Sequence, residues 1–186
     1  MNPSGTVGAD ERLRLFLGFL LPDAAAQAVV AWEHEHLAVE RIRLVPRENL
    51  HVTIAFLGSQ PAGEVERIAG ALRDAVDGVA RPVLRPLRYR ETRSVGMLVL
   101  DDEDRRATRI AEEAHRRLEQ LGVYEPERRK WLPHVTVVRF RERPRLDPPI
   151  PELGPVTMSD AAVYMSRLRP DGAQYEVLES VPLGGG

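Results

Sequence analysis

The stretch VPRENLHVTIAFLG, residues 45–58, decides how this chain folds. It begins with proline, charged residues and asparagine, which are typical of a turn. Residues 50–57 then alternate in polarity as a half-buried strand does. Because residues two apart on a strand face the same side, His51 and Thr53 share one face. The opposite face is expected to enter a core with Leu50, Val52, Ile54 and Phe56.

The same pattern returns in the second half of the chain as HVTVVR, residues 134–139. His134 and Thr136 share one face of the expected strand, with Val135 and Val137 behind them. A strand histidine beside a threonine is, taken alone, most simply a structural hydrogen bond. Two such pairs among five histidines, with matching apolar flanks, indicate a shared function instead.

Periodicity and turn residues predict the elements around these two strands. Helices are expected after Pro61, with apolar residues from Val65 to Val76 at helical spacing, and over about residues 104–121. Another is expected from Asp23, which can cap its helix, to about Val39. Further strands are expected at residues 13–20, 83–89, 97–100, 161–165 and 175–181, the last two joined by a turn at Asp171-Gly172. Helices mixed with strand pairs indicate an α+β fold rather than a doubly wound parallel sheet. Since each half has a helix followed by a His-x-Thr strand, two similar lobes are expected.

Length and composition narrow the possible classes of protein. The 186 residues suit one domain, expected over residues 13–186 behind a loose tail at residues 1–12. The net charge of −2 argues against sequence-independent binding along a duplex, and the absence of cysteine excludes disulfides and thiolate chemistry. No stretch has the length of a membrane span. We therefore expect a cytoplasmic monomer that needs no membrane and no obligate protein partner.

The paired motifs suit acid–base chemistry at phosphorus. Imidazole titrates near neutral pH, so one histidine can take a proton while the other gives one. Threonine hydroxyls can donate hydrogen bonds to phosphate oxygens. Facing each other across a cleft, the two pairs would serve an in-line attack, with cationic groups meeting the developing charge. With no cysteine and no dense carboxylate cluster, neither a metal site nor a cofactor is expected.

Several segments resemble the RNA 2′,3′-cyclic phosphodiesterase family, also called 2′-5′ RNA ligase, of the two-histidine (2H) phosphoesterases. They are residues 14–17 (RLFL), 45–58, 133–136 (PHVT) with Arg139, and 166–168 (SRL) with Gly172 and Tyr175. The resemblance spans about residues 13–183. It implies a bilobal α+β fold, in which two pseudo-symmetric antiparallel-sheet lobes carry their helices on the outside and enclose a central cleft.

The resemblance also implies an active tetrad of His51, Thr53, His134 and Thr136. This tetrad would open the 2′,3′-cyclic phosphate of an RNA end or nucleotide to a 2′-phosphomonoester. In the role assignment adopted here, His134 activates water as the base and His51 protonates the departing 3′ oxygen, although the sequence leaves the order open. With a 5′-hydroxyl in place of water, the reverse reaction would be the family's ligase activity.

Four further residues are candidate substrate contacts. Arg139 resembles a family position that contacts phosphate or sugar, but strict alternation from His134 places it on the opposite face. Contact would require a bend in the strand, and a surface salt bridge is the alternative. Arg47 and Lys130 flank the motifs and could steer an anionic end, or be ordinary solvated charges. Trp131 could stack a base at the cleft edge or anchor the core.

Two other functions remain open on the sequence. The same tetrad could serve a phosphodiesterase for small cyclic nucleotides or for ADP-ribose cyclic phosphate, which would differ in the reach of its pocket. The cleft could also belong to a nucleotide- or RNA-binding module without turnover, although pure binding has less need of both histidines.

Overall fold

The computed structural model describes residues 11–170 and 172–184 of the chain. Its strands are β1 (Arg12–Leu20), β2 (Ile42–Leu44), β3 (His51–Pro61), β4 (Val83–Glu91), β5 (Val95–Asp101), β6 (His134–Phe140), β7 (Val156–Thr157), β8 (Asp160–Arg169) and β9 (Gly172–Pro182). Its helices are α1 (Asp23–His36), α2 (Val65–Val76) and α3 (Arg106–Gln120), with short 3-10 turns η1 (Arg47–Asn49) and η2 (Ala62–Glu64). Antiparallel strands with helices outside them make the fold α+β, as the sequence predicted.

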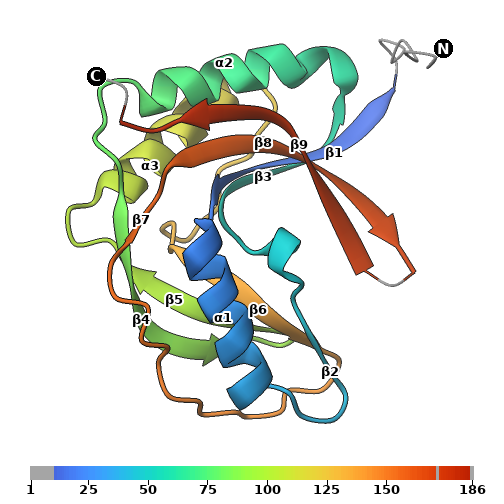
Figure 1. Ribbon diagram of the computed structural model, residues 1–186. Coiled ribbons are helices and arrows are strands. Elements are labelled where there is room, and N and C mark those ends of the chain that lie inside the picture. Colours follow the sequence, from blue (N-terminus) through green and yellow to red (C-terminus); the bar gives the residue numbers. More distant parts are fainter. Residues whose placement is uncertain (1–10, 171, 185–186) are drawn as a thin grey trace, which may run out of the picture.

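The strands form two antiparallel half-sheets. One half-sheet has the order β3-β1-β8-β9, and the other has the order β7-β4-β5-β6, with β2 also paired to β6. The halves join where Val52 of β3 pairs with Val135 of β6, and they curl away from each other beyond this junction (Figure 1). Because an antiparallel pair has a local twofold axis, this junction relates the two lobes by pseudo-symmetry.

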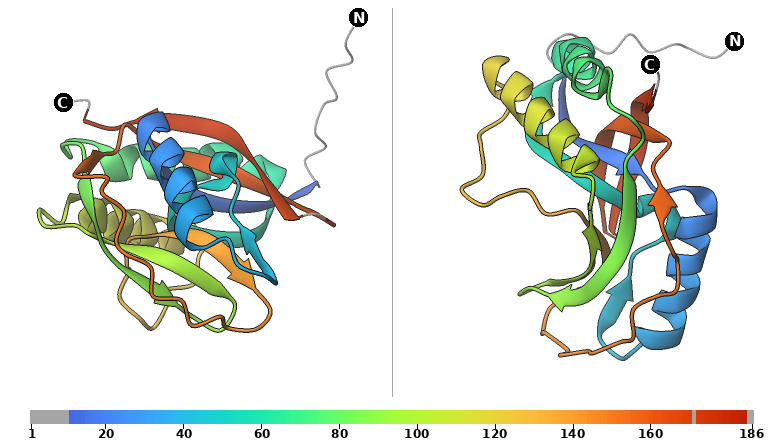
Figure 2. Two further views of the ribbon diagram at one scale, coloured as in Figure 1. Left: turned by 60° about the horizontal axis from the view of Figure 1, so that its bottom comes forward. Right: turned by 90° about the vertical axis from the view of Figure 1, so that its left-hand side faces the viewer.

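The helices cover the outer faces of the lobes. α2 and α3 lie side by side against the half-sheet that contains β3 and β8, whereas α1 packs against the other half, beside β6 (Figures 1 and 2). α2 and α3 each bury a stripe at helical spacing. The fully buried members of these stripes are Ile68, Ala69 and Leu72 in α2 and Ala107, Ile110, Ala111, Ala114 and Leu118 in α3. The inner faces of the half-sheets are thereby left to form a site.

Some local expectations differ from the structure. Asp23 does not cap α1, because Pro22 holds the N-cap position and no side chain caps this end. The helix ends at His36 rather than near Val39. The strands β2 and β7 were not predicted from the sequence, since three and two residues are too short to show a period of two.

Two further predictions, the N-terminal tail and the turn at Asp171-Gly172, fall partly on residues outside the described part of the chain. Of the tail predicted over residues 1–12, residues 1–10 lie outside the described part, and Arg12 already belongs to β1. In the predicted turn, Asp171 also lies outside it, whereas Gly172 begins β9 with a φ of 137° that favours glycine. None of the helices that the structure describes has both the length and the apolar character needed to cross a membrane.

Candidate active site

The two His-x-Thr motifs meet at the junction of the half-sheets. Their central residues, Val52 and Val135, are the antiparallel partners described above and are almost fully buried. The residues flanking such a pair face each other in opposite order. His51 therefore lies across from Thr136, and Thr53 across from His134. All four polar side chains line one cleft, so the structure brings the predicted tetrad together.

Both strands carry the same irregularity after the threonine. Ile54 of β3 has no partner in the register with β1, and Val137 of β6 has none in the register with β5. An extra residue of this kind bends the strand and shifts the alternation of its side chains by one. The burial pattern of the first seven residues is accordingly the same in both strands. As a result, Phe56 and Arg139 both face the cleft.

These bulges correct two expectations. The bulge at Val137 supplies the bend that Arg139 needs, so its side chain lies on the same face as His134 and lines the cleft. Phe56, which was expected in the core, is 62% exposed and lines the same cleft. A strict period of two cannot reveal a bulge, because the extra residue is accommodated only in the pairing with a neighbouring strand.

Side chains from other elements hold the bulge of β3. The carbonyl oxygen of Ile54 accepts a hydrogen bond from Nε2 of His115 at 2.7 Å, and that of Thr53 accepts one from Nε1 of Trp131 at 2.9 Å. In β6 the carbonyl of Val137 accepts the backbone N–H of Val45 at 2.9 Å. Buried carbonyl groups at a bulge lose their hydrogen bond to the neighbouring strand, so they need another donor.

Trp131 is thus placed behind the cleft rather than at its edge. Its indole packs edge-on against Phe19, with ring centroids 6.4 Å apart, and it does not line the cleft. The structure favours the core alternative for this residue. Its role is to hold the strand segment that carries Thr53 in place.

Each cleft histidine is fixed through its Nδ1 atom. This atom lies 2.8 Å from the carbonyl oxygen two residues earlier, of Asn49 for His51 and of Leu132 for His134. A carbonyl only accepts, so Nδ1 carries the proton and the neutral ring keeps Nε2 as an acceptor. In His51, Nε2 lies 3.0 Å from the Thr53 hydroxyl. The two imidazoles therefore present the same nitrogen for proton transfer.

Aromatic rings surround the imidazole of His51. The ring centroids of Phe16, Tyr175 and Tyr164 lie 4.8, 5.3 and 5.7 Å from its own. The pKa of His51 is lowered to about 4, chiefly by burial and in smaller part by the charges of His134 and Arg139, while the hydrogen bond to the carbonyl of Asn49 opposes the shift. His51 is consequently neutral in the empty cleft at neutral pH.

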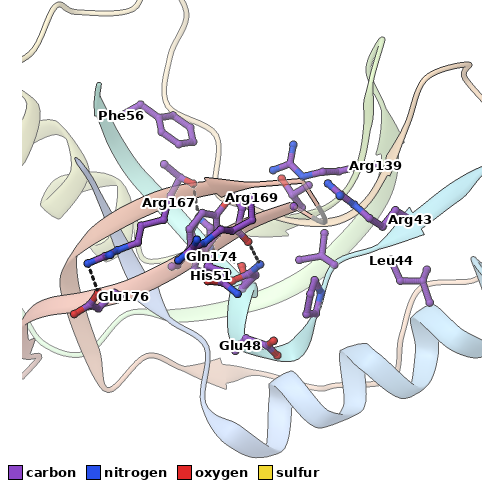
Figure 3. A pocket seen from close by; sticks show the side chains of 18 of the residues that line it. Arg43, Leu44, Glu48, His51, Phe56, Arg139, Arg167, Arg169, Gln174 and Glu176 are labelled. Atoms are coloured by element: carbon purple, nitrogen blue, oxygen red, sulfur yellow. Dashed lines mark hydrogen bonds and ion pairs between the residues drawn. The ribbon is translucent and has the colours of Figure 1, made fainter. Parts of the chain in front are cut away.

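The cleft itself has a volume of about 660 Å³, which is typical of a small-molecule site. Figure 3 shows Arg43 and Arg139 on one side of it and Arg167 and Arg169 nearer its other wall. Arg43 and Arg139 are direct cross-strand partners in β2 and β6. Like charges in this position repel each other, which is typical of a place that an anion occupies.

Sequence reasoning missed some of these residues. Arg43 lies in the unpredicted strand β2, and nothing in its local sequence marks it. Arg167 and Tyr175 lie in the segment whose family resemblance was noted, and both line the cleft. Asn49, which lies in the turn before His51, also lines it and donates a hydrogen bond to the carbonyl of Ala173 at 2.8 Å. This bond ties the β8–β9 hairpin to the start of β3.

Arg47 and Lys130 do not line the cleft. The guanidinium of Arg47 pairs with the carboxylate of Asp23 at 3.0 Å, and Lys130 is exposed in the loop before β6. Both positions agree with the ordinary charged role that the sequence left open. Among the residues that the structure describes, no group of three or more histidine, cysteine or acidic side chains could hold a metal ion.

Comparisons with known proteins bear on this site. The family described as LigT like phosphoesterase matches residues 20–85. The RNA 2′,3′-cyclic phosphodiesterase of Methanocaldococcus jannaschii is 25% identical over 179 residues, which cover 90% of this chain and 99% of that protein. The structure of TT0787 of Thermus thermophilus is 26% identical, with a TM-score of 0.80 over 93% of this chain and 99% of that one. E. coli LigT complexed with 3′-AMP is 21% identical, with a TM-score of 0.78 and the same coverage.

A cleft with two His-x-Thr pairs, built at the junction of two pseudo-symmetric half-sheets, is the arrangement of a 2H phosphoesterase. Within that class, this chain is similar to the LigT-like phosphoesterases, whose family model matches residues 20–85. The predicted fold and the predicted resemblance to this family are thereby confirmed.

Proposed function

We propose that this chain is an RNA 2′,3′-cyclic phosphodiesterase that produces 2′-phosphomonoesters by acid–base catalysis between His51 and His134. The observation that carries the proposal is the placement of both His-x-Thr pairs, with equivalent Nε2 atoms, in one arginine-lined cleft. The relative from Methanocaldococcus jannaschii, which matches along almost its whole length, carries this activity in its name.

In the proposed reaction, Nε2 of His134 takes a proton from water as the water oxygen attacks phosphorus. The bond from phosphorus to the 3′ oxygen breaks on the opposite side, and that oxygen takes a proton from the imidazolium of His51. The products are a 2′-phosphate and a 3′-hydroxyl. Thr53, Thr136 and Arg139 would hold the non-bridging oxygens, where negative charge develops. A 5′-hydroxyl in place of water would run the corresponding ligation.

The lowered pKa of His51 places a condition on this assignment. An acid must carry its proton before the leaving group departs, but His51 is neutral in the empty cleft. An anionic cyclic phosphate beside the imidazole favours its charged form and so raises its pKa. Substrate binding would therefore favour protonation of His51, so that the imidazolium needed as the acid forms when the substrate is bound.

The proposal is tested with purified protein treated with EDTA. The substrates are a nucleoside 2′,3′-cyclic phosphate and an oligoribonucleotide with a 2′,3′-cyclic end, and the products are resolved as 2′- or 3′-phosphates. We expect the 2′-phosphate, turnover that survives EDTA, and a loss of at least ~10³-fold in kcat for His51→Ala and for His134→Ala. His34→Ala is the control, because His34 is exposed on α1 and does not line the cleft, and it should leave turnover unchanged. No turnover of either substrate by folded protein would overturn the proposal and leave a binding role for the cleft.

A further inference from the structure

A second groove continues from the active-site cleft. It has a volume of about 480 Å³ and shares Phe56, Arg139, Arg169 and Tyr175 with the cleft. It extends beyond them to Arg14 at the start of β1 and to Ser166 and Leu168 in β8. Because the groove adjoins the cleft, a ligand whose phosphate lies at the two histidines can extend toward it.

In the part of the chain that the structure describes, the charged side chains that line the groove are all cationic. Four arginines line it, and no acidic side chain is found among the described residues of its lining; the arginines are Arg14, Arg43, Arg139 and Arg169. Within the described part of the chain, Arg14, Arg139 and Arg169 form no ion pair with a carboxylate. For a chain with a net charge of −2, this is a local concentration of positive charge. It fits an anionic ligand with more than one phosphate.

The groove is also lined by two exposed apolar side chains. Leu168 is 71% exposed and Phe56 is 62% exposed, which makes them the two most exposed large hydrophobic residues of the described chain. Both line the groove. The face of an exposed phenylalanine accepts any nucleobase by stacking. Arginines beside an exposed aromatic ring form the combination that binds single-stranded nucleic acid.

Resting on the function proposed above, we propose that this groove is a subsite for the neighbouring nucleotide, the one on the 5′ side of the cyclic phosphate. A 2′,3′-cyclic phosphate ends an RNA strand, so only one nucleotide neighbours the reacting one. Its phosphodiester lies against Arg14 and Arg169, and a base stacks at Phe56. The preferred substrate is then a strand end rather than a mononucleotide.

The test compares kcat/KM for a mononucleoside 2′,3′-cyclic phosphate with that for a short oligoribonucleotide carrying the same end. We expect the oligonucleotide to be favoured about tenfold or more, with a KM that rises more steeply with KCl concentration. The variants Arg14→Gln and Arg169→Gln remove exposed charges of the groove. Each should lower the oligonucleotide preference several-fold and reduce the salt slope by about 0.7.

Arg88→Gln is the matched control, because Arg88 is exposed on β4 and lines neither the cleft nor the groove. It should leave the preference and the salt slope unchanged. Equal kcat/KM and equal salt dependence for the two wild-type substrates would overturn the subsite and leave the phosphodiesterase activity standing. Loss of turnover on both substrates would instead overturn the function on which the subsite rests.

A third substrate separates RNA from another phosphate-linked nucleotide. ADP-ribose cyclic phosphate carries its additional phosphates in a pyrophosphate, and these could also reach the groove. If this compound is turned over better than the oligonucleotide and responds to Arg14→Gln, the groove belongs to a pyrophosphate-linked nucleotide and the RNA assignment is wrong.

Discussion

Phe56 and Arg139 occupy equivalent positions in two pseudo-symmetric strands. Each follows a cleft histidine by five residues and a bulge by two, and each faces the cleft because of that bulge. The two strands are thus alike in backbone but opposite in chemistry at this position, with an apolar ring in β3 and a cation in β6. A symmetric scaffold thereby offers unlike surfaces to the cleft, an apolar ring on one side and a cation on the other.

Removing the guanidinium of Arg139 is expected to impair the reaction. A charged hydrogen bond to phosphate contributes about 1.5–3 kcal/mol, so Arg139→Gln should lower kcat/KM roughly 10- to 100-fold. Arg139→Lys should retain part of the activity, since it keeps the charge but loses the planar geometry. Arg141→Gln is the control, because Arg141 is exposed just after β6 and does not line the cleft. Equal activity of Arg139→Gln and wild type would exclude the phosphate contact.

The ring of Phe56 is expected to act on binding rather than on chemistry. Stacking contributes about 1–3 kcal/mol per base, so Phe56→Ala should raise KM for the oligoribonucleotide with a 2′,3′-cyclic end about tenfold with little change in kcat. Phe56→Tyr should keep the ring and hence the affinity. Inhibition by inorganic phosphate, which has no base, should be the same for all three proteins. A Phe56→Ala protein with normal KM would show that the base lies elsewhere.

The pKa of His51 is expected to depend on occupancy of the cleft. Burial lowers it to about 4 in the empty site, and a bound phosphate should raise it because opposite charges favour the protonated ring. NMR titration of the imidazole signals, with and without a 2′-nucleotide product, measures both values, and His51→Ala assigns the signal. A pKa that stays near 4 in the complex would reverse the roles and make His51 the base and His134 the acid.

Trp131 is expected to act on catalysis through the position of Thr53. Trp131→Phe keeps most of the packing against Phe19 but removes the donor to the Thr53 carbonyl. A buried carbonyl left without its donor costs about 1–3 kcal/mol, so the free energy of unfolding should fall by that amount. Because a displaced Thr53 misplaces the phosphate, kcat should fall several-fold. If only stability fell and kcat stayed normal, Trp131 would be a purely structural residue.

Glu33 is expected to make the protein less stable as pH rises toward 8. The residue is 1% exposed, its Oε1 has no hydrogen-bond partner within the described part of the chain, and burial raises its pKa from 4.5 to about 8. Between these values the unfolded chain releases the proton while the folded chain keeps it. The free energy of unfolding therefore falls with rising pH, by up to about 1.4 kcal/mol per pH unit.

Urea unfolding at pH 6.5 and at pH 8 measures this effect. His51 does not interfere in that interval, because its lowered pKa costs stability only as pH falls from about 6.5 toward about 4. Wild type should lose roughly 2 kcal/mol between the two pH values, and Glu33→Gln should lose much less. Glu35→Gln is the control on the same helix, where the carboxylate is exposed. Equal losses in wild type and Glu33→Gln would show that Glu33 is ionised in the folded protein.

The sequence by itself determined the elements and the paired motifs. Apolar periodicity and turn residues located the three helices and the longer strands within a few residues, because both signals lie within the segment itself. The spacing of His51 from Thr53, and of His134 from Thr136, placed each pair on one face, because side chains on a strand alternate. The resemblance of residues 45–58 then indicated the family to which the comparisons show similarity.

Only the tertiary structure decided what surrounds these pairs. The bulges that turn Phe56 and Arg139 into the cleft arise in the pairing with β1 and β5, and so they are invisible in the strand's own sequence. Arg43 and Arg169 come to the site from β2 and β8, elements far apart along the chain. The pKa of His51 depends on aromatic rings from three strands. Such properties depend on non-local contacts, whereas alternation and periodicity are local.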